Sequence, residues 1–418
     1  MARVSLVWQA GLLAVAMSAV GCSGGDGAVA PPGSGPEAAP LQAAALDTVR
    51  ACPGGGLVDA AFRDAALAMF RQLAVQAPGR DAHGAVRMHW TPGHRDLQGQ
   101  AWYQVQAYQA NLSVVQVLRT DPTLAPLAAD WLRWQARHMR AVGQGQGVVF
   151  DHWLRAADLQ VAACPPALAG PCPFVDSYDS TAASMLMVAD SYHAVTGDVA
   201  VLREAAVQAA LRASAATVAA LHQADGLTWA KPDYSVAYLM DAVEVAAGWR
   251  AWARVQQAAY GDTAGAARSV AMAQRTEDAT RALLWHAPSQ TWRHAVQAGA
   301  PDFSRWYADT VAQAWPLLWG VEGPRSGDAA NAWRRASARW LGADDWSRRN
   351  VDAAGFWWPA AAVAAQCVGD TASARAWIAR ARDAWLRPEQ PFPWTFHVGD
   401  LRWLLWMADP RGAVSGRR

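Results

Sequence analysis

Apolar residues recur at helical spacing from about residue 57 onward, in segments that alternate between two kinds. One kind is apolar on nearly every side, as in "FWWPAAAVAAQC" at 356–367. The other is rich in Arg and Ala, as in "ASARAWIARARDAW" at 372–385. A helix that is apolar all round must be buried, whereas a helix with one polar face borders solvent. The alternation therefore predicts buried helices, each paired with a half-exposed one. No segment alternates convincingly with a period of two, so strands are not expected.

Gly followed by Asp marks the junction between several of these segments, at 197–198, 261–262, 327–328 and 369–370. A Gly just past a helix adopts the left-handed conformation that ends it, and the following Asp caps the next helix. Asp121, before Pro122, has the same position without the Gly. The pairs predict an all-α protein, an (α/α)6 toroid with inner and outer rings of helices. The expected helices lie near 57–76, 98–119, 123–141, 177–195, 199–222, 234–259, 263–285, 304–320, 328–341, 353–367, 371–386 and 399–408.

The connections into the apolar helices are long, whereas the turns after them are short. All the long connections must therefore lie at one end of the toroid, above the N-termini of the inner helices. His, Trp, Arg and Asp residues concentrate in them, and long loops on a rigid scaffold commonly carry function. This end is the predicted site. The long connections cover 78–97, 142–176, 223–233, 286–303, 342–352 and 387–398.

The first 21 residues have the layout of a bacterial lipoprotein signal. Arg3 precedes an apolar run that is too short to span a membrane and ends at Cys22. Small residues just before this Cys predict that Cys22 is acylated, and Ser23 after it is typical of proteins sent to the outer membrane. An ordinary cleaved signal peptide is the alternative. We therefore expect a lipid-anchored protein of the bacterial cell envelope, facing the periplasm and held to the membrane by its lipid only.

Residues 22–50 are rich in Gly, Pro and Ala, which predicts a flexible tether. The remaining residues, 51–410, are expected to form one domain that is monomeric. The 36 basic and 35 acidic residues give a net charge of +1, so charge does not favour nucleic acid as a partner. The chain holds 24 Trp against 8 Phe, and the flat Trp face suits the stacking of sugar rings as well as core packing.

Five cysteines suit an oxidising compartment, because assigning Cys22 to the lipid leaves an even number. Cys164 and Cys172 flank a Pro-rich loop and are the predicted local disulfide. Cys52 and Cys367 are left as a weaker long-range pair. No cluster of His residues stands beside these Cys, so neither a metal nor another cofactor is expected.

The stretch "WAKPDYSVAYLMDAVEVAAGW", Trp229–Trp249, is apolar almost all round yet carries Asp233, Asp241 and Glu244. Buried acids are costly unless they are paired or used. Asp233 is expected to cap the helix at the mouth of the toroid, either as a site carboxylate or as a cap alone. Asp241 and Glu244 share a side of the helix; Asp241 is expected to be the buried partner of a neighbouring Arg or Trp N–H, and Glu244 is expected to be structural.

Other candidates for sugar binding stand in or beside the long connections. Asp176 and Asp179 are expected in the first turn of a helix, where the helix dipole stabilises a carboxylate. One of them would cap the helix and the other would bind sugar hydroxyls. The remaining candidates are aromatic or basic side chains, namely Trp229, Arg305, Trp306, Trp357, Trp394 and His397.

The hairpin pattern and the segment "DSYDS" at 176–180, followed by "TGD", resemble the six-hairpin glycosidases, and the glucoamylase-like group most closely. In that group an Asp-Tyr pair at this helix binds the terminal sugar, and an Asp-Gly-x-Trp-Glu loop supplies the general acid. Here the loop reads "DGLTWAKPDY", with Ala230 where that Glu would stand. The base of the group is a Glu before a Phe-Pro segment, and Glu389 precedes "PFPWTFH".

The resemblance implies hydrolysis of a glycosidic bond in an oligosaccharide or exopolysaccharide, which needs an acid and a base or nucleophile. Glu389 is the expected base. Asp225 or Asp233 must then replace the missing acid, and Asp233 is preferred. A non-catalytic lipoprotein that binds glycans or assists polysaccharide assembly is the alternative. A polysaccharide lyase using Tyr234 or His397 beside Arg305 is a third, disfavoured because the rim is not basic.

Overall fold

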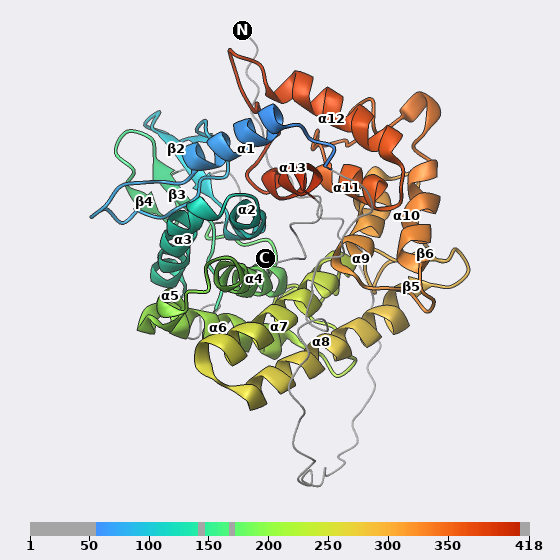
Figure 1. Cartoon of the computed structure of the whole chain (residues 1–418), viewed down its shortest axis with the longest axis horizontal. Coiled ribbons are helices and arrows are strands. Elements are labelled where there is room, and N and C mark those ends of the chain that lie inside the picture. The colour runs from blue at the N-terminus through green and yellow to red at the C-terminus, as the bar shows by residue number, and fades with distance from the viewer. Residues whose placement is uncertain (1–55, 141–146, 167–171, 410–418) are drawn as a thin grey trace.

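A closed ring of helices forms the centre of the computed structural model, which describes residues 56–140, 147–166 and 172–409. Each inner helix packs against the next one along the chain, and the last packs back against the first (Figure 1). The inner helices are α2 (Ala107–Thr120), α4 (Tyr178–Thr196), α7 (Leu239–Tyr260), α9 (Ala314–Trp319), α11 (Pro359–Cys367) and α13 (Asp400–Ala408).

A second set of helices surrounds this ring (Figure 1). Each packs against the inner helix that precedes it along the chain, except α1, which packs against α13, and the short α5, which packs against α6 and α7. The predicted all-α toroid is confirmed. The outer helices are α1 (Ala60–Leu73), α3 (Ala125–His138), α5 (Ala200–Arg203) with α6 (Ala205–Leu221), α8 (Thr263–Leu284), α10 (Asp328–Ala338) and α12 (Thr371–Trp385).

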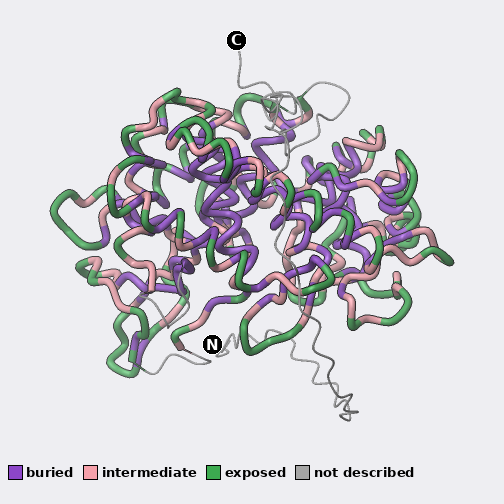
Figure 2. Tube along the Cα trace, turned by 90° about the horizontal axis from the view of Figure 1, so that it is seen from below, coloured by how far each residue is buried: buried purple, intermediate pink, exposed green. Residues whose placement is uncertain are grey.

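Burial follows the predicted alternation. Nearly every side chain of α4 and α13 is buried, whereas α8 and α12 bury one face only. Figure 2 shows the buried runs inside the molecule and the exposed residues on its loops and outer turns. Gly248 lets α7 approach α4 closely, because a Cβ atom there would lie 2.6 Å from the Cβ of Ala183. The apolar helices therefore make the core, and the half-exposed helices cover it.

Most of the Gly-Asp pairs join the end of one helix to the start of the next, as predicted. Gly197 and Gly261 end α4 and α7 with φ of 69° and 65°, and Asp262 caps α8 by accepting a backbone N–H bond in its first turn. The mark at Gly327 is different. It stands at the start of α10, while Gly320 ends α9.

Several inner helices begin later than predicted because the loops before them have structure of their own. The helix expected from residue 98 begins at Ala107, since residues 101–105 form a strand. The helix expected from 234 begins at Leu239, after a tight turn at 231–234. The helix expected from 353 begins at Pro359. Further one-turn helices are η2 (Pro122–Leu124), η3 (Trp306–Thr310), η4 (Val311–Gln313) and η5 (Gly342–Asp344).

Short strands are present, contrary to the expectation that there would be none. They pair residues of different long loops or close a tight turn, so each has only two to five residues and no alternation long enough to detect. Four form an antiparallel sheet in the order β1-β2-β3-β4, with Tyr103 opposite Leu154. They are β1 (His94–Arg95), β2 (Ala101–Val105), β3 (His152–Arg155), β4 (Val161–Ala162) and the separate pair β5 (Trp285–His286) and β6 (Thr291–Trp292).

The predicted disulfide between Cys164 and Cys172 is confirmed, with the two Cα atoms 5.8 Å apart. Cys52 lies outside the described residues, so its pairing with Cys367 stays a prediction. The expected signal (1–21), Cys22 and the tether (22–50) also lie outside them. In the described part of the chain, no helix is both long and apolar enough to cross a membrane.

Candidate active site

The N-terminal ends of the inner helices meet at one end of the ring, which we call the mouth. Tyr108 of α2 and Trp315 of α9 both donate hydrogen bonds to Glu244 of α7 there, at 2.9 Å each. Toward the other end of the ring, Arg254 of α7 pairs with Asp190 of α4 at 2.6 Å. Ser177, just before α4, also contacts Asp241 in the first turn of α7 at 2.9 Å, so α4 and α7 run side by side in the same direction.

The long loops bond to one another around the mouth. The backbone N–H of Tyr178 donates to the carbonyl of Ala230 at 2.7 Å, which joins the loop before α7 to the start of α4. The N–H of Val398 donates to the carbonyl of Met88 at 2.9 Å, which joins the last loop to the first. The loops expected at one end of the toroid therefore lie together there.

Asp241 and Asp179 share one hydroxyl group at the mouth. Ser177 Oγ contacts Asp179 Oδ1 and lies 2.9 Å from Asp241 Oδ2. Asp179 is completely buried and also accepts from Thr228 Oγ1 at 2.5 Å and from the N–H of Ser180 at 2.8 Å. Burial, followed by the charges of Asp179 and Glu244, holds the pKa of Asp241 well above its ordinary value. The environment of Asp241 therefore favours its neutral, protonated form.

Glu244 lies below Asp241 on the same side of α7 and is fully buried. Burial raises its pKa to about 7, although the hydrogen bonds from Trp315 and Tyr108 and the charge of Arg402 lower it. Arg402 of α13 is buried too, with its guanidinium 4.4 Å from the ring centre of Trp319. The Trp N–H expected to bond Asp241 therefore bonds Glu244 instead, while Asp241 contacts Ser177.

Asp176 lies just before α4 and remains accessible to solvent. The surrounding protein raises its pKa, and the ammonium of Lys231 lowers it. Asp151, in the loop before β3, is buried and accepts a hydrogen bond from Gln104 at 2.7 Å. Burial and the charge of Asp176 raise the pKa of Asp151 to about 7, although the hydrogen bond from Gln104 and the charge of Lys231 lower it. Lys231 therefore stabilises the anionic forms of both carboxyls.

Aromatic side chains gather near these carboxyls from η3 and from the loops before α11 and α13, and we call them the aromatic wall: Tyr307, Phe356, Trp358 and Trp394. Tyr307 stacks on Trp358 with ring centres 5.1 Å apart and an interplanar angle of 14°. Tyr307 and Trp394 keep 57% and 38% of their surface exposed. Trp358 has φ of 48°, a left-handed conformation that is rare for a bulky residue and often found at functional sites.

The wall and the carboxyls belong to one site. Burial of the phenol raises the pKa of Tyr307 most, and the charges of Asp176 and Asp241 raise it next. Tyr238, at the start of α7, has its pKa raised in part by the charge of Asp241. An aromatic face opposite carboxyl groups is an arrangement that suits a sugar ring, which has apolar C–H faces and hydroxyls at its edge.

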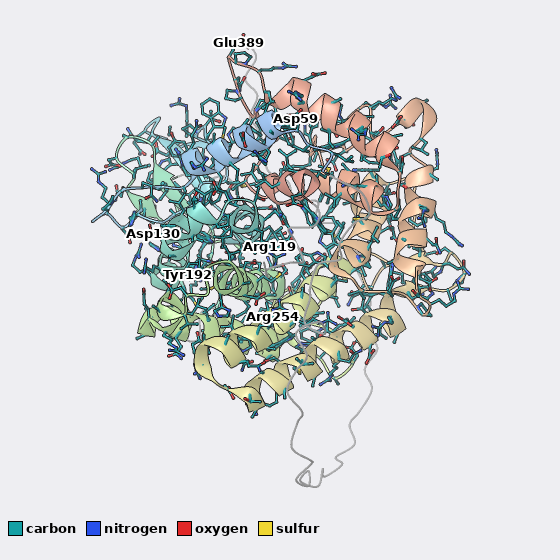
Figure 3. The ribbon with its side chains drawn as sticks, in the orientation of Figure 1. Asp59, Arg119, Asp130, Tyr192, Arg254 and Glu389 are labelled. Carbon is teal, nitrogen blue, oxygen red and sulfur yellow. A yellow bond between two sulfur atoms is a disulfide. The ribbon has the colours of Figure 1, made fainter. Side chains whose placement is uncertain are left out.

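The structure does not bring Asp233 and Glu389 together. Asp233 is exposed in the turn at 231–234, and Tyr238 rather than Asp233 is the N-cap of α7. The expectation that Asp233 caps the helix is therefore wrong, because α7 begins at Leu239, several residues after the start of the apolar segment. Glu389 is exposed at the outer edge of the molecule, beyond α1 and α12 (Figure 3). The expected acid–base pair across the mouth is not supported by this placement.

Two predicted stacking residues point elsewhere. Trp306 is buried, with its ring 5.8 Å from Trp346, so it belongs to the core. Trp357 is half-buried and packs 5.5 Å from Trp385 of the outer helix α12. In both places the next residue in the chain, Tyr307 or Trp358, belongs to the aromatic wall instead.

The remaining candidates lie near the mouth in different settings. Arg305 is exposed, with its guanidinium 2.7 Å from the buried Asp309. His397 is half-buried beside Phe356, and burial lowers its pKa to about 4, so its ring is neutral. Trp229 is half-buried, and its backbone N–H donates to the carbonyl of Leu221 at 3.1 Å. These three keep their predicted roles as hypotheses.

Sequence reasoning gave Asp241 a structural role and assigned none to Asp151, Tyr108 or Lys231. The signal that would have found Asp241 is the correct start of α7, which puts it in the first turn. Within the described ranges, no group of three or more His, Cys, Asp or Glu side chains is arranged to hold a metal ion.

Comparison with known proteins finds similarity in structure only. No family model matches the chain, and no curated protein does. A glycosidase variant in complex with glucose superposes with a TM-score of 0.54 at 15% identity, over 86% of this chain and 100% of that one. A wild-type glycosidase gives 0.52 at 16% identity, over 86% and 100%.

A rhamnosidase from Klebsiella oxytoca with rhamnose bound gives a TM-score of 0.49 at 14% identity. It is matched over 86% of this chain and 66% of its own length, so the chain spans just under two thirds of that protein. That likeness is too distant to support an argument. The better matches establish that this chain has a fold found in glycosidases.

Proposed function

We propose that this protein is a glycoside hydrolase whose general acid is Asp241 and whose base is Asp176. The observation that carries the proposal is the pair of unlike environments at the mouth. Asp241 is held as the neutral acid by burial and by Asp179 and Glu244. The pKa of Asp176 is raised less strongly, because its carboxyl is open to solvent and the charge of Lys231 lowers its pKa. Two carboxyl groups whose environments push their pKa values apart suit acid–base cleavage of a glycosidic bond.

Each carboxyl has access to what its role needs. Asp241 is partly exposed in the first turn of α7, so its carboxyl can meet the oxygen of a leaving group. Asp176 is exposed and can hold a water molecule. It belongs to the "DSYDS" segment that resembles the glucoamylase-like group, which supports a relation to that group. The substrate would be an oligosaccharide or polysaccharide, in keeping with the glucose-bound glycosidase of similar fold.

The aromatic wall should contribute to binding rather than to chemistry. Tyr307→Ala removes the most exposed ring of the wall, and we expect glycan affinity to fall about threefold to tenfold, since an aromatic contact adds ~0.5–1.5 kcal/mol beyond its area. Calorimetry on the Asp241→Asn background would measure binding without turnover. Tyr307→Phe keeps the ring and should bind like the parent. Equal loss in both variants would assign the effect to the hydroxyl and contradict stacking.

A non-catalytic glycan-binding or polysaccharide-assembly lipoprotein is the second candidate. Ala230 favours it, because this residue stands where the glucoamylase-like loop has its acid and its side chain is buried. A lyase acting on uronates is disfavoured, since carboxyls outnumber Lys231 at the mouth and would repel an anionic sugar.

The test is to incubate the wild type with a panel of neutral oligosaccharides and polysaccharides and to measure new reducing ends. Calorimetry on the same panel measures binding. Hydrolysis of at least one glycan that binds supports the proposal. Binding without any new reducing ends favours the lipoprotein that only binds glycans. An unsaturated product, detected by its ultraviolet absorbance, would instead establish a lyase.

We also propose that the protein is anchored in the outer membrane, facing the periplasm, through a lipid on Cys22. The apolar run that ends at this Cys supports the proposal. Cys22→Ala should move the protein from the membrane pellet to the soluble fraction of the envelope, because the residue that would carry the lipid is then missing. Ser23→Asp keeps the lipid and should send the protein to the inner membrane. Unchanged fractionation of Cys22→Ala would contradict the anchor.

A further inference from the structure

Ser177 stands between two carboxyl groups but has a single hydroxyl hydrogen. Its Oγ contacts Asp179 Oδ1 on one side and Asp241 Oδ2 at 2.9 Å on the other. A hydroxyl can donate to one acceptor only, and ionised carboxylates have no proton to give. Both contacts are hydrogen bonds only if one of the two carboxyls carries a proton of its own.

The hydrogen bonds of Asp179 show which carboxyl is protonated. Asp179 accepts from the hydroxyl of Thr228 at 2.5 Å and from the N–H of Ser180 at 2.8 Å, and these donors stabilise its anion. Among the described residues, Asp241 contacts no donor except Ser177. The extra proton therefore resides on Asp241, where it bonds to Ser177 Oγ, and Ser177 donates its own hydrogen to Asp179.

Other charged groups around Asp241 favour the same arrangement. Its own helix contributes Glu244, and the segment before α4 contributes Asp176, both of which oppose a second negative charge. The remaining titratable neighbours are phenols, which carry no charge at neutral pH. They come from the start of α7, from η3 and from α2, and are Tyr238, Tyr307 and Tyr108.

We propose that Ser177 is a positioning residue that keeps the acid proton on Asp241 and then stabilises the carboxylate left when that proton is given up. This proposal depends on the proposed function. When the glycosidic C–O bond breaks, the proton of Asp241 moves to the leaving oxygen, while a water adds to the sugar and gives its proton to Asp176. The hydroxyl hydrogen of Ser177 then turns from Asp179 to Asp241. No bond of Ser177 breaks, and Asp179 keeps its two other donors.

The kinetic test compares Ser177→Ala with Ser177→Thr. Loss of the hydroxyl should lower kcat about 10- to 100-fold with KM unchanged, because a hydrogen bond to a charged group is lost after proton transfer. Ser177→Thr keeps a hydroxyl and should recover most of that loss. Ser184→Ala is the matched control, since it removes another buried hydroxyl from α4, one that bonds to Asn111. Wild-type kcat in Ser177→Ala, or an equal fall in the control, would overturn the proposal.

A second measurement does not need turnover. The difference between the infrared spectra of the wild type and Asp241→Asn at neutral pH should contain one neutral-carboxyl band, because the other raised carboxyls, Glu244, Asp151 and Asp400, are present in both proteins. In Asp179→Asn the neighbouring charge is gone, so this carboxyl should ionise at a pH lower by at least about one unit. An ionised Asp241 in the wild type would overturn the shared proton. If the neutral carboxyl is present but no glycan is hydrolysed, the proton arrangement stands and the proposed function fails.

Asp179 is buried, so Asp179→Asn could unfold the protein. Thr228→Val takes only one donor from Asp179 and should shift the proton from Asp241 toward Asp179, which moves the neutral carboxyl band. Thr228→Ser keeps the donor and should leave the band in place. Identical bands in both Thr228 variants would overturn the assignment of the proton.

Discussion

Replacing Asp241 by Asn should lower kcat for a glycan substrate by about 10²- to 10⁴-fold, the usual contribution of a positioned general acid. Asn has nearly the same shape and can still contact Ser177, so folding and glycan binding should be retained. The cause is specific: an amide has no acidic proton for the leaving oxygen. Reducing-end assays and calorimetry on the same glycan would measure the two effects separately.

Asp176→Asn should give a loss of similar size, because it removes the base that takes the proton of the attacking water. Asp233→Asn is the matched control, since Asp233 is exposed in the nearby turn and was the acid expected from sequence. It should leave kcat within about twofold of the wild type, as surface changes usually do. Loss of turnover in Asp233→Asn, with full activity in Asp241→Asn, would reverse the assignment.

Glu244 should make the protein less stable as the pH rises from about 4.5 to 7. Burial raises its pKa from 4.5 to about 7, so between these values the folded chain binds a proton that the unfolded chain has released. Stability therefore falls as pH rises through this window, by up to about 3 kcal/mol at about 1.4 kcal/mol per pH unit. Urea unfolding at a series of pH values would measure the free energy of unfolding. Asp151, with a pKa of about 7, and Asp400, raised by burial to about 8, add slope of the same sign.

Glu244→Gln should flatten this pH dependence, because an amide does not titrate while its carbonyl can still accept from Tyr108 and Trp315. Glu389→Gln makes the same chemical change on an exposed side chain at the edge of the molecule (Figure 3). It should keep the pH dependence of the wild type. Equal slopes for wild type and Glu244→Gln would show that Glu244 does not titrate in this range.

The ring of helices could be predicted from sequence because it depends on a property of whole segments. An inner helix is surrounded by protein and must be apolar all round, so segments such as 359–367 differ from 371–385 over many residues. Helix starts could not be predicted equally well. Residues 101–105 are apolar or neutral, and only their pairing with β3 makes them a strand. Residues 231–234 form a local turn, closed between Lys231 and Tyr234, that separates Asp233 from the start of α7.

The error at one helix start determined the main error at the site. Beginning α7 at 234 makes Asp233 the cap and puts Asp241 two turns inside, whereas beginning it at Leu239 puts Asp241 in the first turn. Asp176 and Trp394 were found because they lie in loops whose position does not depend on a helix boundary. Ser177 could not be recognised, because its role comes from two carboxyls that belong to different helices.

Closure of the ring also affects how the chain is made. The last inner helix, α13, packs against α2 and α1, and the N–H of Leu57 bonds to the carbonyl of Met407 at 2.8 Å. During synthesis, α2 and α11 therefore leave the ribosome before α13, which is the helix that joins them and closes the ring. The apolar flank of α2 stays exposed until nearly all of the domain has emerged, which is the condition in which partly folded chains aggregate. Under the proposed export to the periplasm, this late closure favours a chain that stays unfolded until it has crossed the membrane.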